Sequence, residues 1–186
     1  MTNIYRTACW IACLLCCVHT LCGKNVEGDV NYVLIINTYT ESTPWSNSMI
    51  YPIVSMASQD EKLGVYTEHM NMDGEEELAA FEKNIFKDFE TRPPKLIVLL
   101  GTASFILCED LDRQWPDIPI ILCGERDYAG NKDMVLKKQP LTPEERMPLT
   151  AWQGKYNMTS MPIQVYFEEN LDLMKRLIPG MKEVLY

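Results

Sequence analysis

Lys95-Leu-Ile-Val-Leu-Leu-Gly101 is an aliphatic run that follows two prolines and ends on a glycine. The run is too short for a stable helix, and its residues do not alternate between apolar and polar. This pattern predicts a strand buried on both faces, as in the middle of a parallel sheet that helices cover on each side. Residues 32–36 and 118–123 have the same character, so we expect at least three such strands.

Amphipathic segments separate these strands. The spacing of apolar residues predicts helices over residues 46–60, 75–89, 102–115 and 163–178. Residues 64–72 alternate between apolar and polar, which favours a strand at the edge of the sheet. The order over residues 30–178 therefore predicts an α/β domain, with a parallel sheet and helices on both faces.

Two later segments do not fit this alternation. Residues 128–155 are predicted to be irregular, and a connector of that length is typical of a functional or partner-binding loop. Residues 181–186 begin another strand. Because a domain does not normally end inside a strand, we expect this strand to open a truncated second unit.

The first 23 residues have the pattern of a targeting segment. Arg6 supplies a positive charge, and residues 7–23 contain no Lys, Arg, Asp or Glu. The apolar stretch is short for a membrane-spanning helix and suits a signal peptide. A cleaved signal peptide and a retained signal-anchor both remain open, and in either case we expect the rest of the chain to be exported.

Composition and motifs exclude several function classes. The net charge of −9 argues against nucleic-acid binding, which needs a basic surface. Only Cys108 and Cys123 lie beyond the first 22 residues, so a metal site is not expected, and the two could be a disulfide or two buried thiols. Dinucleotide, P-loop, receiver and nucleophile-elbow motifs are missing. The sequence thus predicts neither a catalytic residue nor a cofactor.

Small and polar residues follow the three buried strands. In open α/β sheets, ligands bind beyond the carboxyl ends of the strands, where the strand order reverses. We expect this reversal beside the first strand, which brings the three strand ends to one crevice. The candidate ligand-binding residues there are Asn37, Thr38, Tyr39, Trp45, Gly101, Thr102, Ser104, Gly124 and Glu125.

Some of these residues have a structural interpretation beside the functional one. Tyr39 and Trp45 either line a ligand cleft or pack their loop onto the edge of the sheet. Thr102 and Ser104 either cap a helix or donate hydrogen bonds into the cleft. His69, on the predicted edge strand, is interpreted as a solvated or packing residue.

The chain resembles a known family in several segments that occur in the same order. These are Val33-Leu-Ile-Ile-Asn-Thr-Tyr39 with Trp45, Leu96-Ile-Val-Leu-Leu-Gly-Thr102, Ile118-Pro-Ile-Ile-Leu-Cys-Gly124, Asn157-Met-Thr-Ser160, Leu177-Ile-Pro-Gly180 and Lys182-Glu-Val-Leu-Tyr186. They are similar to the extracytoplasmic ABC-type substrate-binding-like family, especially to the periplasmic sensor region of hybrid two-component histidine kinases. Ser160 stands where the family has a glycine.

The resemblance implies a type I periplasmic-binding-protein fold, in which a small molecule binds between two α/β lobes. Residues 30–178 would form the first lobe, and residues 181–186 would open the second. The implied function is that of a periplasmic sensor domain that signals by lobe closure to a kinase part of the parent chain. A substrate-binding protein of an ABC transporter is the alternative. Because most of the second lobe is missing, we expect the isolated chain to self-associate, for instance as a homodimer, or to be only marginally stable.

Overall fold

The computed structural model describes residues 31–70, 74–152, 154–162 and 167–178, together with residues 180 and 183. The targeting segment predicted over residues 1–23 lies outside them. The strand predicted over residues 181–186 also lies outside them, apart from Glu183.

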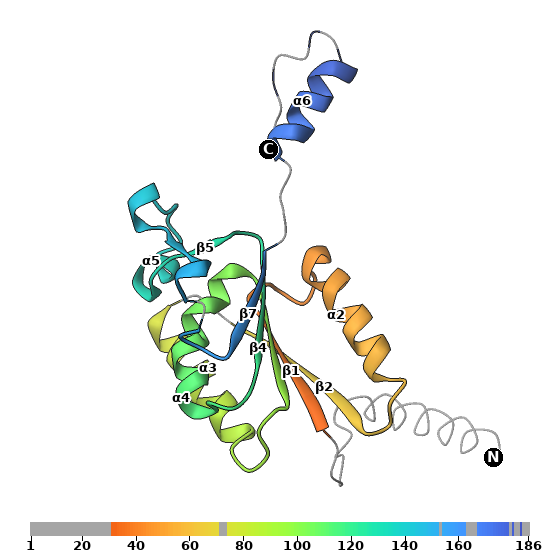
Figure 1. Cartoon of the computed structure of the whole chain (residues 1–186), viewed down its shortest axis with the longest axis vertical. Helices are drawn as coiled ribbons and strands as arrows, with labels where there is room; N and C mark the ends of the chain where they lie inside the picture. The colour runs from red at the N-terminus through yellow and green to blue at the C-terminus, as the bar shows by residue number, and fades with distance from the viewer. Residues whose placement is uncertain are drawn as a thin grey trace, which may run out of the picture. The chain divides into compact units, whose positions relative to one another are not determined.

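A parallel sheet of five strands forms the centre of the fold, in the order β2-β1-β3-β4-β7 (Figure 1). All four neighbouring pairs are parallel. The strands are β1 (Asn31–Asn37), β2 (Leu63–His69), β3 (Leu96–Leu100), β4 (Ile120–Gly124) and β7 (Met158–Pro162). The chain moves from β1 to β2 on one side and then returns to β3 on the other side of β1. The predicted α/β class, the edge position of β2 and the reversal beside β1 are therefore confirmed.

Helices α3 (Glu75–Asp88) and α4 (Cys108–Gln114) cover one face of the sheet (Figure 1). The glutamates at the start of α3 carry negative charge beside its free N–H groups, which favours a helix start there. Side chains of alternate strand residues meet the apolar sides of these helices on this face. The buried members of this cluster include Leu34, Ile36, Leu99, Leu122, Leu78, Ile85 and Leu111.

Helix α2 (Pro44–Ala57) covers the opposite face, over β1 and β3 (Figure 1). Pro44 lies in the first turn, where its missing N–H is not needed. Ile50 from this helix is buried with the strand residues that point to this face. Those strand residues are Val33, Ile35, Val98, Leu100 and Cys123.

The segment after β3 begins as a 3₁₀ helix, η1 (Thr102–Leu107), and continues as α4. The sequence predicts one helix over residues 102–115, and the structure has a 3₁₀ helix followed by an α-helix. Helix α2 begins two residues before the predicted start and ends before the predicted end. Helix α6 (Phe167–Leu177) ends one residue before the predicted end, and residues 163–166 lie outside the described residues. In α6, Leu173 and Leu177 are exposed.

The prediction of an irregular connector over residues 128–155 is only partly correct. Strands β5 (Tyr128–Ala129) and β6 (Met147–Pro148) pair as an antiparallel ribbon. Helix α5 (Lys132–Leu136) and the 3₁₀ turns η2 (Pro143–Glu145) and η3 (Leu149–Trp152) lie in the same region. These elements are short because prolines interrupt the backbone hydrogen bonding of the region.

Strand β7 lies where the sequence pattern predicts no strand, between residues 124 and 163. Its sequence, Met-Thr-Ser-Met-Pro, has no aliphatic run, because it lies at the edge of the sheet. Its backbone pairs with β4 from Ile120↔Met158 to Gly124↔Pro162. Residues 158–162 are therefore assigned as a strand by their backbone pairing with β4, which the mixed composition of this edge strand does not reveal.

Cys108 and Cys123 are both buried free thiols. Cys108 packs with the cluster under α3 and α4, whereas Cys123 packs with the cluster under α2. The two side chains thus lie on opposite faces of the sheet. Burial raises the pKa of the Cys108 thiol to about 12. The structure therefore supports the interpretation of Cys108 and Cys123 as two buried thiols and not as a disulfide.

Candidate functional site

The carboxyl ends of β1, β3 and β4 lie side by side. In the register of the sheet, Asn37 is opposite Leu100, and Leu100 is opposite Cys123. The three strands therefore end at nearly the same level, and the residues that follow them meet at one edge of the sheet. This is the convergence that the strand pattern predicted.

Asn37 holds the loop that follows β1. It is fully buried, and its Oδ1 accepts a hydrogen bond from the backbone N–H of Tyr39 at 3.1 Å. His69 Nδ1 lies 3.3 Å from Asn37 Nδ2 and 3.0 Å from the Tyr39 carbonyl oxygen. His69 thus fastens the Tyr39 loop to the edge strand, which is a more specific role than the packing interpretation from the sequence.

Gly101 allows Thr38 to lie directly against the end of β3. Its φ of +93° is in the region that favours glycine. A Cβ atom here would be 2.1 Å from Thr38 Oγ1. The backbone N–H and the hydroxyl of Thr38 both donate to the carbonyl oxygen of Leu100, at 3.1 and 3.0 Å.

Thr102 and Glu125 join the ends of β3 and β4. The backbone N–H of Thr102 donates to Glu125 Oε2 at 2.9 Å. The hydroxyl oxygen of Thr102 accepts from the backbone N–H of Arg126 at 3.2 Å. Gly124 permits this approach, because a Cβ atom there would be 2.6 Å from Thr102 Oγ1. The two strand ends therefore form one hydrogen-bonded unit.

Two further predicted residues have partners within the protein. Ser104 is fully buried, and its hydroxyl donates to the carbonyl oxygen of Gly101 at 2.6 Å. The Trp45 ring lies 5.1 Å from the Tyr39 ring, centroid to centroid, and packs against the α2 side of the core. This contact supports the interpretation that Tyr39 and Trp45 pack their loop onto the sheet.

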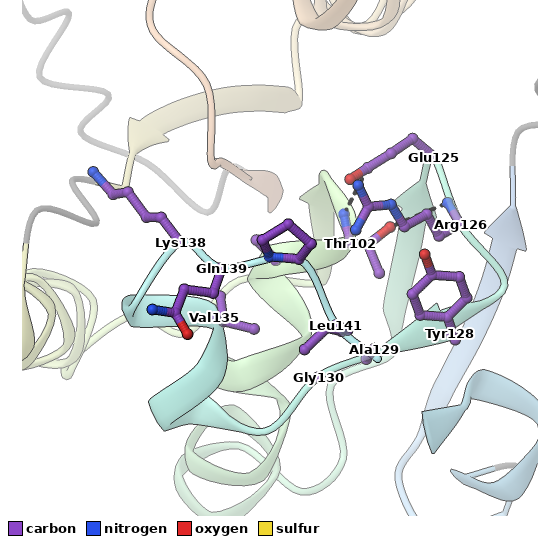
Figure 2. A pocket seen from close by; sticks show the side chains of 12 residues that line it. Thr102, Glu125, Arg126, Tyr128, Ala129, Gly130, Val135, Lys138, Gln139 and Leu141 are labelled. Carbon is purple, nitrogen blue, oxygen red and sulfur yellow. Dashed lines mark hydrogen bonds between the residues drawn. The ribbon is translucent and has the colours of Figure 1, made fainter. Parts of the chain in front are cut away.

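A cavity of about 350 Å³ lies beyond the ends of β3 and β4 (Figure 2). This volume is within the range of small-molecule sites. Its wall combines the strand ends with the connector that follows β4. The lining residues are Thr102, Ala103, Glu125, Arg126, Tyr128, Ala129, Gly130, Val135, Lys138, Gln139, Pro140 and Leu141.

Only two of the nine predicted site residues, Thr102 and Glu125, line this cavity. The others form the hydrogen-bonded and packed support at the strand ends described above. They are Asn37, Thr38, Tyr39, Trp45, Gly101, Ser104 and Gly124. The sequence pattern does not identify the connector residues that complete the wall, and the one signal for them is the length of residues 128–155.

A second cavity, of about 510 Å³, lies along the outer part of the sheet. It is lined by backbone and side chains of β4 and β7 and their preceding turns, including Ile121, Asn157, Thr159 and Met161. No charged side chain lines it. The strand-end cavity has both charged and hydroxyl groups, and we therefore take it as the candidate site.

Burial raises the pKa of the Tyr39 phenol to about 12, and the negative charge of Glu125 contributes in the same direction. Because the folded protein favours the neutral phenol, Tyr39 stabilises the fold fully below its ordinary pKa of 10.0. This contribution is lost as the pH rises from 10 through 12. We expect the free energy of unfolding to fall less steeply over this window in Tyr39→Phe than in the parent. Urea unfolding at a series of pH values measures it.

Tyr32 has a pKa raised to about 12 as well, mainly by burial, so it contributes to the same window. Tyr32→Phe is therefore the control, and each single variant should remove only part of the pH dependence. Identical pH profiles for the parent and Tyr39→Phe would contradict the description of the Tyr39 environment.

Within the described part of the chain, no group of three or more His, Cys, Asp or Glu side chains could hold a metal ion. No helix among the described residues is long and apolar enough to cross a membrane.

Comparison of the chain with protein-family models, with curated proteins and with solved structures gave no match.

Proposed function

We propose that residues 31–178 form a small-molecule-binding lobe of an exported sensor domain, with the ligand in the strand-end cavity. The observation that carries this proposal is the position of the cavity. It lies beyond the carboxyl ends of β3 and β4, and β3 is the neighbour of β1, where the strand order reverses. Open α/β sheets bind their ligands in this region.

The lining of the cavity is suited to recognition. Glu125, Arg126, Tyr128 and Gln139 supply charged and polar groups, while Val135 and Leu141 supply apolar surface. A few polar groups in a partly apolar pocket orient a small molecule. The hydrogen bonds among Thr102, Glu125 and Arg126 hold one wall of the pocket in position before a ligand arrives.

Signalling by this lobe requires a second surface. A ligand shifts a conformational equilibrium only when it binds one state more tightly than the other. In the two-lobed arrangement implied by the family resemblance, the closed state supplies the additional contacts. Closure of the two lobes around the ligand would then be transmitted to a histidine kinase in the parent chain.

The delivery of a solute to an ABC transporter is the function that this proposal must be tested against. Both functions use the same cavity, so the parent polypeptide discriminates between them. A parent chain that contains kinase sequence after the second lobe supports the sensor. A parent chain that consists of the two lobes alone contradicts it and supports the transporter protein.

Filling the cavity should abolish ligand binding. Ala103 lines the cavity from the first turn of η1, so Ala103→Phe would place a ring in the volume that the ligand needs. We expect affinity for the ligand identified in a thermal-shift screen of small metabolites to fall by about a hundredfold or more, equivalent to about 3 kcal/mol. Tryptophan fluorescence or calorimetric titration measures it.

Ala80→Phe is the matched control, because Ala80 is exposed on α3, away from the cavity lining. It should bind the ligand as the parent does. Equal affinity of Ala103→Phe and the parent, with both proteins folded, would show that the ligand binds elsewhere.

A further inference from the structure

Arg126 and Arg146 lie against the same aromatic ring at the cavity. The guanidinium carbon of Arg126 is 5.6 Å from the centroid of the Tyr128 ring, and that of Arg146 is 4.7 Å from it. The two guanidinium groups are therefore no farther apart than the sum of these distances. Tyr128 and Arg126 both line the cavity (Figure 2).

The backbone fixes this arrangement. Tyr128 pairs with Pro148 in the β5–β6 ribbon, and Arg146 directly precedes β6. The backbone N–H of Leu149 donates to the carbonyl oxygen of Asp127 at 2.8 Å. Arg126 is held from the other side, since its N–H donates to Thr102 Oγ1. The two arginines thus start from backbone positions that are defined relative to the cavity.

Neither arginine forms an ion pair with a carboxylate of the described residues. The ion pairs of the described residues include those of Arg113, Lys132 and Lys175. The lack of a carboxylate partner for Arg126 and Arg146 is unexpected, because acidic residues outnumber basic ones by 26 to 17 in the chain. Two cations that share a ring also repel each other, and a cation–π contact offsets only about 0.5–1 kcal/mol at an exposed site.

Positively charged side chains line the cavity, although acidic residues outnumber basic ones in the whole chain. Arg126 and Lys138 line the cavity as cations, and Glu125 is the acidic residue that lines it. Oε2 of Glu125 already accepts the N–H of Thr102. Arg146 is not among the lining residues, but its guanidinium group lies on the ring of Tyr128, which lines the cavity. Two guanidinium groups therefore lie at one lining ring in a protein whose net charge is −9. A guanidinium group presents its donors as a planar fork that matches the oxygens of a carboxylate or phosphate.

We propose that Arg126 and Arg146, ordered by Tyr128, recognise a small oxyanion group of the ligand, a carboxylate or a phosphate. This inference rests on the proposed function, since it assigns a chemical class to the ligand of the same cavity. The ring of Tyr128 positions both guanidinium groups, and the oxyanion supplies the opposite charge that the described residues do not.

Citrate and inorganic phosphate are the probes that test this inference. Each is titrated into the full chain at constant ionic strength, with binding followed by tryptophan fluorescence. We expect saturable binding of at least one probe. The double variant Arg126→Gln/Arg146→Gln should weaken it by about tenfold or more, because charge-assisted hydrogen bonds are the strong ones. Arg126→Lys/Arg146→Lys should also weaken it, since lysine keeps the charge and loses the fork.

Arg113→Gln is the matched control, because Arg113 is an exposed arginine whose charge is paired with Glu109 and Asp110. It removes one positive charge from the chain and should leave probe affinity unchanged. Equal weakening in Arg113→Gln, or the absence of saturable binding by the parent, overturns the inference.

Failure of the inference is distinguishable from failure of the proposed function. If uncharged compounds from the metabolite screen bind, and Ala103→Phe blocks them, the cavity is a ligand site and only the oxyanion assignment is wrong. If Ala103→Phe leaves the binding of every screened ligand unchanged, the proposed function fails, and with it the assignment of a ligand class to this cavity.

Discussion

Replacing Gly101 by alanine is expected to destabilise the fold by about 3–5 kcal/mol. The added Cβ atom would lie 2.1 Å from Thr38 Oγ1 and 2.9 Å from Cε2 of Tyr39. Neither neighbour moves freely, since the hydroxyl of Thr38 is bonded to Leu100 and the ring of Tyr39 is packed on Trp45. The backbone adds to the cost, because a φ of +93° is unfavourable for any residue with a Cβ atom. Urea unfolding gives the free energy difference.

Gly154→Ala is the control for the backbone contribution. Gly154 also has a positive φ, +79°, but a Cβ atom there meets no heavy atom within 4 Å. It should therefore lose only the conformational part, about 1–2 kcal/mol. The difference between the two variants isolates the contact at the strand ends, and equal losses would contradict the close approach of Thr38 to Gly101.

Leu99→Ala is expected to cost about 3–5 kcal/mol. Leu99 lies in β3, the central strand of the sheet, and is 0% exposed. It belongs to the cluster that joins the sheet to α3 and α4. Its truncation removes buried apolar surface and leaves a cavity that the neighbouring strands β1 and β4 are too constrained to fill. The measurement is again the free energy of unfolding in urea.

Leu177→Ala makes the same chemical change at a side chain that is 71% exposed. Little apolar surface is uncovered there, so the expected loss is within about 0.5 kcal/mol. Comparable losses at the two positions would show that residues 95–101 do not form the central strand.

The aliphatic runs made most of the sheet predictable from the sequence. A run such as residues 96–100 has one stable environment, a strand covered on both faces, and its composition reveals this without tertiary information. Strand β7 has no such run, because an edge strand with Thr159 and Ser160 satisfies its pairing through backbone hydrogen bonds. Its register with β4 comes from the fold, and no local pattern encodes it.

The candidate site was predictable to the extent that topology determines it. Thr102 and Glu125 line the cavity because parallel strands bring their carboxyl ends to one edge. The direction of each side chain was not predictable. Asn37 and Ser104 turn inward and bond to backbone groups, which a strand-end position alone does not reveal.

The far wall of the cavity was the least predictable part. Tyr128 lines the cavity and meets Arg146, which is not a lining residue, through the β5–β6 ribbon. The strands of this ribbon contain only two residues each. Strands of two residues show no periodic pattern of apolar side chains. The sequence therefore indicates a long connector but does not reveal which of its residues contact one another. The proposed oxyanion-binding pair therefore became visible only in the folded chain.

The most direct test of the central proposal is a map of backbone amide chemical shifts during titration with the ligand found in the metabolite screen. We expect the largest changes at the residues that line the strand-end cavity: Thr102, Ala103, Glu125, Arg126 and Tyr128. Amides on the sheet surface around Ile121 and Thr159 should remain unchanged. Largest changes at Ile121 and Thr159, with none at the ends of β3 and β4, would contradict the assignment of the ligand to the strand-end cavity.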